Sequence, residues 1–235
     1  MLGTLVNTFT VIIGGLLGLL LGSRVRQRLR DTVMQGIGLC TLIIGVRGAL
    51  STDNVLTLII CVVLGGFLGE GVNIEKRLEG LGGRAERLLY GGKPADSSLF
   101  VQGFMAASLL FCVGPMSIMG PLESGLSGNH ATQIAKAIMD GTASVFMAAA
   151  LGPGVLLSAA SILVYQGALT IGASLLAPLL TDPVIAEVSA VGGVIILGIG
   201  LNMIGVAKIR AGNLLPSIFL PIAYLPLAAW ISGLF

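Results

Sequence analysis

The amino-acid sequence predicts an all-α membrane protein, a bundle of about eight spanning helices. Two observations carry this prediction. The 235 residues are 55% hydrophobic and 10% charged, with a mean hydropathy of +0.99, whereas soluble domains carry about 25% charged residues. Eleven of the 13 Lys and Arg residues fall into three clusters separated by long apolar stretches. Such alternation is typical of a polytopic protein with basic cytoplasmic loops.

The apolar stretches have the length that membrane spans require. A spanning helix needs about 20 mostly apolar residues. This criterion places spans at 3–22, 33–50, 54–72, 98–119, 132–151, 154–177, 184–206 and 213–234. Eight spans put every basic cluster on the cytoplasmic side, and both termini outside. The whole chain, 1–235, is therefore predicted to be one transmembrane domain in the cytoplasmic (inner) membrane, with the lipid bilayer as its surroundings.

The basic clusters set the predicted orientation. They comprise Arg24, Arg26, Arg28 and Arg30; then Lys76, Arg77, Arg84, Arg87 and Lys93; then Lys208 and Arg210. The second cluster lies in the largest predicted cytoplasmic loop, 73–97, which mixes charges of both signs. Residues 74–89 of this loop form either an amphipathic helix on the membrane surface or a solvated connector.

A glycine pattern occurs twice. Gly14-Gly15-Leu16-Leu17-Gly18 recurs as Gly65-Gly66-Phe67-Leu68-Gly69. A spacing of four residues puts Gly14, Gly18 and Gly22 on one helix face, where another backbone can pack closely. We expect this face to meet another helix, either within the chain or across a homo-oligomer.

A second pattern occurs three times and predicts internal repeats. A small residue and a glycine are separated by six residues, and a variable residue follows two positions after the glycine. The copies run from Gly38 to Arg47, from Ala107 to Met116 and from Gly193 to Asn202. Spans one and two thus resemble a parallel duplicate of spans three and four, and span seven an inverted relative. Inverted repeats are common in transporters, with the binding site at the repeat interface.

The fourth span is predicted to be broken in its outer half. Pro115 cannot donate a hydrogen bond to the helix and clashes with the preceding turn, and Gly114 adds backbone freedom beside it. Non-helical backbone at membrane depth is tolerated where protein buries it or a watery cavity solvates it. The alternative is a proline-kinked helix followed by an ordinary loop. Candidate binding residues here are Gly114, Pro115, Ser117, Glu123 and Asn129.

The fifth span carries two charges that can pair. Lys136 and Asp140 are four residues apart, which places both on one helix face. Charges inside a span face the bundle interior or a cavity rather than lipid. They form either a neutralised pair that fixes the orientation of the helix or a site for a solute or ion. In the second case the span neighbours the broken helix, and Asp140 binds a cation or a proton.

Other polar residues within spans are fewer. Gln166 and Asn202 complete the candidate site, Asn7 caps or bridges helices, and Arg47 reaches toward the membrane interface. His130 is the only histidine, so no histidine-based metal site is expected. Motifs of hydrolases, redox enzymes and nucleotide-binding proteins are missing. The sequence therefore predicts no enzyme activity, no cofactor, no metal and no nucleic-acid partner.

The chain also resembles a known family. The segment Phe111-Cys112-Val113-Gly114-Pro115-Met116, with Lys136, Asp140-Gly141 and Tyr165-Gln166-Gly167 downstream, is similar to bacterial inner-membrane proteins of domain-of-unknown-function family 554. Gly3-Thr4 with Asn7, and Gly192-Gly193 through Asn202, extend the resemblance over essentially the whole chain. It implies a polytopic inner-membrane protein of a kind often described as a transporter, without naming a solute or functional residues.

These observations favour a transporter that moves a small solute or ion across the cytoplasmic membrane. Two alternatives remain open. The first is an ion channel whose pore forms in an oligomer. The second is a membrane scaffold or accessory subunit that transports nothing and uses its charges only for packing.

Overall fold

The structure is a computed structural model, and it describes residues 1–22, 27–90 and 97–232. Within these residues the chain is helical apart from turns and short connections, and it contains no strand. In chain order, with η for 3-10 helices, the elements are α1 (Leu2–Gly22), α2 (Gln27–Ala49), α3 (Val55–Val72), α4 (Ile74–Tyr90), α5 (Ser97–Cys112), α6 (Pro115–Leu126), α7 (Ala131–Leu151), α8 (Gly154–Ile171), α9 (Ala173–Leu176), η1 (Ala177–Leu179), α10 (Asp182–Met203), η2 (Ala211–Ile218) and α11 (Leu220–Ser232). Arg24, Arg26 and Lys93 of the predicted basic clusters lie outside the described residues.

Among the described residues, six helices are long and apolar enough to cross a membrane: α1, α2, α3, α7, α8 and α10. Two pairs of helices are each apolar enough to form one bent span, which gives up to eight spans. The axes of α5 and α6 are bent by 57° at their junction, and those of η2 and α11 by 41°. The protein is therefore an all-α polytopic membrane bundle, and the break in the predicted fourth span is confirmed. The break in the predicted eighth span was not expected. Pro216 and Pro221 lie on either side of it, and neither can donate to a helical ladder.

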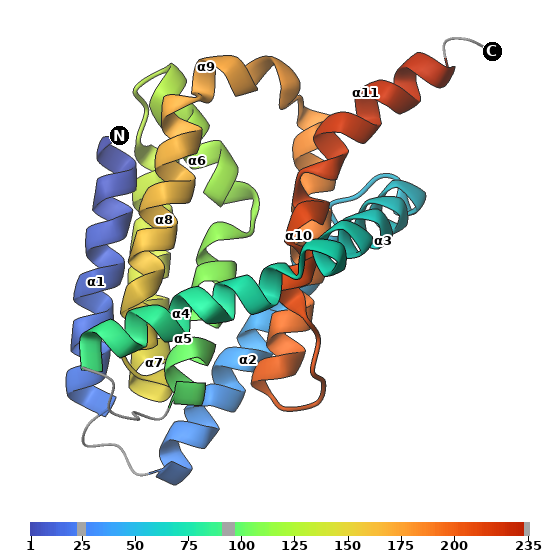
Figure 1. Cartoon of the computed structure of the whole chain (residues 1–235). Helices are drawn as coiled ribbons and strands as arrows, with labels where there is room; N and C mark the ends of the chain where they lie inside the picture. The colour runs from blue at the N-terminus through green and yellow to red at the C-terminus, as the bar shows by residue number, and fades with distance from the viewer. Residues whose placement is uncertain (23–26, 91–96, 233–235) are drawn as a thin grey trace.

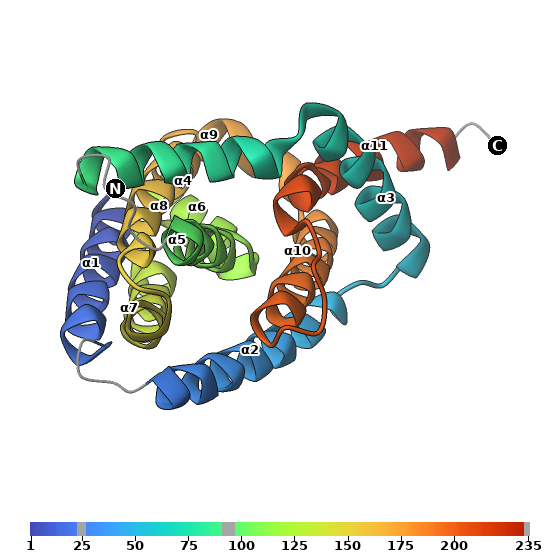
Figure 2. The same ribbon diagram turned by 60° about the horizontal axis from the view of Figure 1, so that its bottom comes forward.

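The helices α1 and α7 lie side by side and run in the same direction (Figures 1 and 2). The closest approaches pair Gly14 with Gly141, Gly18 with Val145 and Gly22 with Ala149. Because glycine has no Cβ, the two backbones come together without side chains between them. The prediction that this glycine face meets another helix is confirmed, and the partner helix belongs to the same chain.

A second close pair, α2 and α10, runs antiparallel. Gly38 lies against Ile204, Gly45 against Leu197, and Gly48 against Gly193. Two of the three copies of the six-residue-spaced pattern thus face each other. In the same way, Gly65 and Gly69 of α3 pack antiparallel against Ser217 and Asn213 of η2. The recurring glycines therefore serve close packing, and the inverted repeat stays a prediction.

The helix α4 crosses the bundle instead of running along it (Figure 1). Ile74, Leu78 and Gly82 lie on its inner face, and Gly82 packs against Phe104 of α5. Its arginines, by contrast, are exposed: Arg77, Arg84 and Arg87. The segment 74–89 is thus an amphipathic helix docked on the bundle. Its contact with a membrane surface stays a prediction.

Candidate functional site

The break between α5 and α6 frees a backbone carbonyl inside the bundle. Pro115 begins α6 and has no N–H, so the carbonyl of Phe111 lacks its usual helical donor. Two side chains replace that donor, since Lys136 Nζ and Ser117 Oγ each donate to the Phe111 oxygen over 2.9 Å. Gly114 joins the two helices at φ 144° and ψ 158°. This backbone region is populated almost only by glycine.

Lys136 and Asp140 form a buried ion pair next to this break. They lie one turn apart on α7 and are only 5% and 8% exposed, and Lys136 Nζ binds Asp140 Oδ2 directly. Asn7 of α1 donates to the same carboxylate oxygen over 3.0 Å. The predicted pair is thus confirmed as a contact. Through it and the Phe111 carbonyl, three helices are joined at one point: α1, α5 and α7.

A cavity of about 560 Å³ opens onto the ion pair and the break. We call it the break cavity. Its lining residues come from α2, α5, α6, α7, α10 and the adjoining connections, and they include four predicted residues: Gly114, Ser117, Lys136 and Asp140. Arg47, Ser51 and Ser189 also line it. Arg47 is exposed near the outer end of α2, where it was expected to reach toward the membrane interface. Ser51 and Ser189 gave no signal in the sequence, because their place in the lining depends on how α2 and α10 pack.

The remaining predicted residues lie away from this cavity. Glu123 accepts a hydrogen bond from the Thr132 hydroxyl over 2.7 Å, and Asn129 accepts one from the Ala131 N–H over 3.1 Å. Both therefore order the connection between α6 and α7. Gln166 is fully buried and joins the ion pair through Asn7, whose Nδ2 lies 3.1 Å from Gln166 Oε1. Asn202 lies in a different cavity, described below.

Comparison with known proteins agrees with the membrane architecture. A family model described as "Protein of unknown function (DUF554)" matches residues 2–225. The chain belongs to the DUF554 family. A Bacillus subtilis (strain 168) protein, "Uncharacterized membrane protein YdfK", is 28% identical over 225 residues, which cover 94% of each chain. The Escherichia coli (strain K12) "Uncharacterized protein YqgA" is 32% identical over 232 residues, which cover 97% of each. No solved structure matches the chain.

In this DUF554 protein the ion pair is connected to a network of buried amide and hydroxyl side chains between α1, α7 and α8, which we call the buried polar network. Gln133 Nε2 donates to Thr4 Oγ1 over 2.9 Å and lies 3.4 Å from Gln166 Oε1. Three atoms of the buried polar network have no hydrogen-bond partner among the described residues: Asn7 Oδ1, Gln133 Oε1 and Gln166 Nε2. Unpaired buried polar atoms are uncommon and call for a functional or solvation explanation. The buried polar network therefore extends the polar site from the ion pair toward the N-terminal end of α1.

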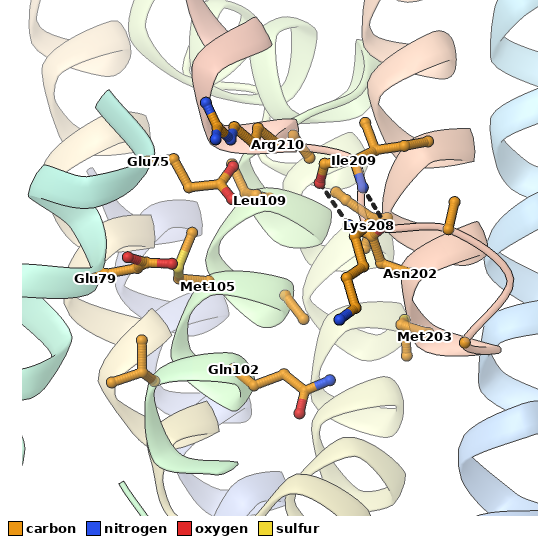
Figure 3. Close-up of a pocket in the computed structure, with 16 residues that line it drawn as sticks. Glu75, Glu79, Gln102, Met105, Leu109, Asn202, Met203, Lys208, Ile209 and Arg210 are labelled. Carbon is orange, nitrogen blue, oxygen red and sulfur yellow. Dashed lines mark hydrogen bonds between the residues drawn. The ribbon is translucent and has the colours of Figure 1, made fainter. Parts of the chain in front are cut away.

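A second cavity of about 800 Å³ lies between α4, α5 and the end of α10, and we call it the α4 cavity (Figure 3). Figure 3 shows Glu75 and Glu79 of α4 on one side of this cavity, Lys208 on the other and Gln102 lower in the view. The Gly212 N–H donates to Glu75 Oε2 over 2.9 Å. Burial nevertheless raises the pKa of the Glu75 carboxyl group.

Asn202 shapes the α4 cavity through the backbone of the chain. Its Nδ2 donates to the Ile209 carbonyl over 2.6 Å, and its Oδ1 accepts from the Ile209 N–H over 2.7 Å. This pair of hydrogen bonds closes the turn after α10 and engages both the oxygen and the nitrogen of the Asn202 side-chain amide (Figure 3). Asn202 therefore holds the wall that carries Lys208.

The two cavities follow one another along α5 and α10. Leu109 and Ile199 line the α4 cavity, and the break cavity begins at Leu110 and Ile196. The two linings meet at adjacent residues on α5 and lie one turn apart on α10, and Leu109, Ile196 and Ile199 are all buried. The bundle therefore holds two neighbouring chambers, each with charged residues in its lining, and buried apolar side chains lie where the two linings meet.

The backbone at Gly114 offers a specific test of the break. We expect Gly114→Ala to lower the free energy of unfolding by about 1–3 kcal/mol, the typical strain of a non-glycine residue in this backbone region. Contacts with other parts of the fold add nothing to this strain, because a Cβ placed at Gly114 meets no such atom within 4 Å. Chemical unfolding in detergent measures the effect. Gly71→Ala in α3, where a Cβ also meets open space, is the control. Equal losses in both variants would contradict the strained break.

Proposed function

We propose that the protein carries a small solute or ion across the cytoplasmic membrane, and that the break cavity is its binding site. The observation that carries this proposal is the ion pair of Lys136 and Asp140, held at the break of a span and facing a cavity. Ionisable groups inside a membrane protein are costly, and they commonly mark solute or ion pathways. Broken helices supply binding groups in many secondary transporters.

The two chambers support a carrier in particular. A carrier that exposes its site alternately to each side needs a closed layer that can open. The apolar turn between Leu109–Leu110 and Ile196–Ile199 is such a layer. The recurring sequence pattern fits the same scheme. Its first two copies end at Arg47 and Met116 in the break cavity, and its oppositely directed copy ends at Asn202 in the α4 cavity.

Flux measurements separate this proposal from its rivals. Purified protein in proteoliposomes is expected to move a solute down an imposed solute or ion gradient, whereas protein-free liposomes do not. A membrane scaffold would give no flux with any solute or ion tested. An oligomeric channel would give voltage-driven single-channel currents, which a carrier does not. No flux above the liposome background in a screen of ions, amino acids, amines and organic acids would contradict the proposal.

The proposed orientation places the basic segments 24–31, 73–97 and 208–212 in the cytoplasm, and 51–53 with 121–131 outside. The charge distribution supports this orientation through the positive-inside rule. In a variant lacking the native cysteines, we expect a cysteine at position 127 to react with an impermeant reagent added to intact cells. A cysteine at position 84 should stay unlabelled until the cells are opened. Both replaced residues, Ser127 and Arg84, are exposed. Labelling in the opposite order would reverse the orientation.

A further inference from the structure

The break cavity carries one more positive than negative charge. Lys136 and Asp140 bind each other, so their charges cancel. Arg47 of α2 lines the same cavity, and no carboxylate in the described part of the chain forms an ion pair with its guanidinium. Arg47 is exposed and lies near the outer end of α2, so its guanidinium is open to an incoming ligand, and its positive charge attracts an anion.

Apart from Arg47 and the Ser51 hydroxyl, the side-chain donors of the cavity lining are already engaged. Ser117 donates its hydroxyl hydrogen to the Phe111 carbonyl, and Ser189 donates to the Ile185 carbonyl over 2.5 Å. Asp140 Oδ2 accepts from both Lys136 and Asn7. Arg47 therefore offers the main free donor group. Its planar guanidinium has five N–H donors and matches a carboxylate in a two-pronged hydrogen bond.

The remaining walls of the cavity are apolar. They include Ile44, Leu110, Val113, Met116, Met139 and Ile196. The volume of about 560 Å³ falls within the usual range for small-molecule sites, roughly 300–1,000 Å³. A bare inorganic anion would leave these walls without contacts. The ammonium group of an amino acid would have to compete with Lys136, which already neutralises the charge of the Asp140 carboxylate.

We propose that the break cavity binds a small monocarboxylate with an apolar chain, and that the carboxylate pairs with Arg47. This inference rests on the proposed function, because it names the class of solute that the same cavity carries. The apolar chain of the ligand would lie against Leu110, Met116 and Ile196, and its charge would bring the net charge of the cavity to zero.

Equilibrium binding to the purified full-length protein in detergent tests this assignment without requiring transport. The probes are butanoate, the cation butan-1-amine, the zwitterion 2-aminobutanoate and chloride. We expect butanoate to bind most tightly of the four. Arg47→Gln should weaken butanoate binding by roughly 10- to 100-fold, the usual effect of losing a charge-assisted hydrogen bond. Arg28→Gln, which removes an exposed arginine near the other end of α2, should leave the affinity unchanged.

Each other outcome overturns the assignment. Tighter binding of the amine, of the zwitterion or of chloride alone would show a different ligand class, and binding of none would show that the cavity takes no solute of this kind. If Arg47→Gln does not fold, Arg47→Lys keeps the charge but not the two-pronged geometry, and unchanged affinity there would exclude paired recognition. Flux of another solute without butanoate binding would refute the ligand class and leave the transport proposal standing.

Discussion

Replacing Gly18 with leucine is expected to push α1 away from α7 and to lower the free energy of unfolding by about 3 kcal/mol, the upper part of the range for overpacked sites. A Cβ at Gly18 would fall onto the backbone carbonyl oxygen of Val145, and it would lie 3.0 Å from the Cβ of Ala148. A backbone atom cannot rotate aside as a side chain can. The two helices must therefore separate along their whole glycine face.

Chemical unfolding of the purified variant in detergent measures this loss. Gly36→Leu is the matched control, because it adds the same side chain at a position of α2 where a Cβ meets no atom within 4 Å. We expect the control to keep the stability of the parent or to exceed it, since leucine favours helix more than glycine does. Equal stability of Gly18→Leu and Gly36→Leu would show that α1 and α7 do not pack as described.

Removing one partner of the buried ion pair is expected to have an even larger effect. Asp140→Asn leaves the Lys136 ammonium buried without its counter-charge, which typically costs about 3–5 kcal/mol. The Phe111 carbonyl still binds the ammonium but cannot neutralise it. In Lys136→Met with Asp140→Asn, both charges are gone. Replacing a buried pair by neutral residues of similar size is often neutral for stability, so the double variant should recover most of the loss.

The parent, Asp140→Asn, Lys136→Met and the double variant form a cycle that can be compared by chemical unfolding in one detergent. The parent and the double variant should unfold at similar denaturant concentrations, and Asp140→Asn well below both. Strictly additive losses would mean that the two side chains do not interact in the folded protein. Such additivity would remove the buried pair from the site.

The sequence predicted those features that depend on neighbouring residues in the chain. Proline chemistry at Pro115 gave the break of the fourth span, and the four-residue spacing of Gly14, Gly18 and Gly22 gave a packing face. The spacing of Lys136 and Asp140 gave their contact. Each of these three features depends only on residues within a few turns of one helix, whose geometry is fixed by the regular helical repeat.

Partners in other helices could not be predicted in this way. Nothing in the sequence indicates that the freed Phe111 carbonyl accepts from Lys136, or that α1 pairs with α7. For the same reason the sequence did not indicate that Arg47, besides being exposed near the outer end of α2, lines the break cavity. Asn202 lies near the end of α10 and lines the α4 cavity, and its amide is used by the nearby Ile209 backbone. Local hydrogen bonds of this kind take polar residues out of a site that spacing alone would include.

Transport by the folded double variant tests the role of the break cavity most directly. The measurement is solute or ion flux in proteoliposomes, with the parent, Lys136→Met with Asp140→Asn, and Gly36→Leu reconstituted at equal density after their folding has been checked. If the ion pair at the break serves transport, the double variant is folded but loses flux, and Gly36→Leu transports like the parent. If the folded double variant transports at the parental rate, the pair only holds α1, α5 and α7 together and the transport site lies elsewhere.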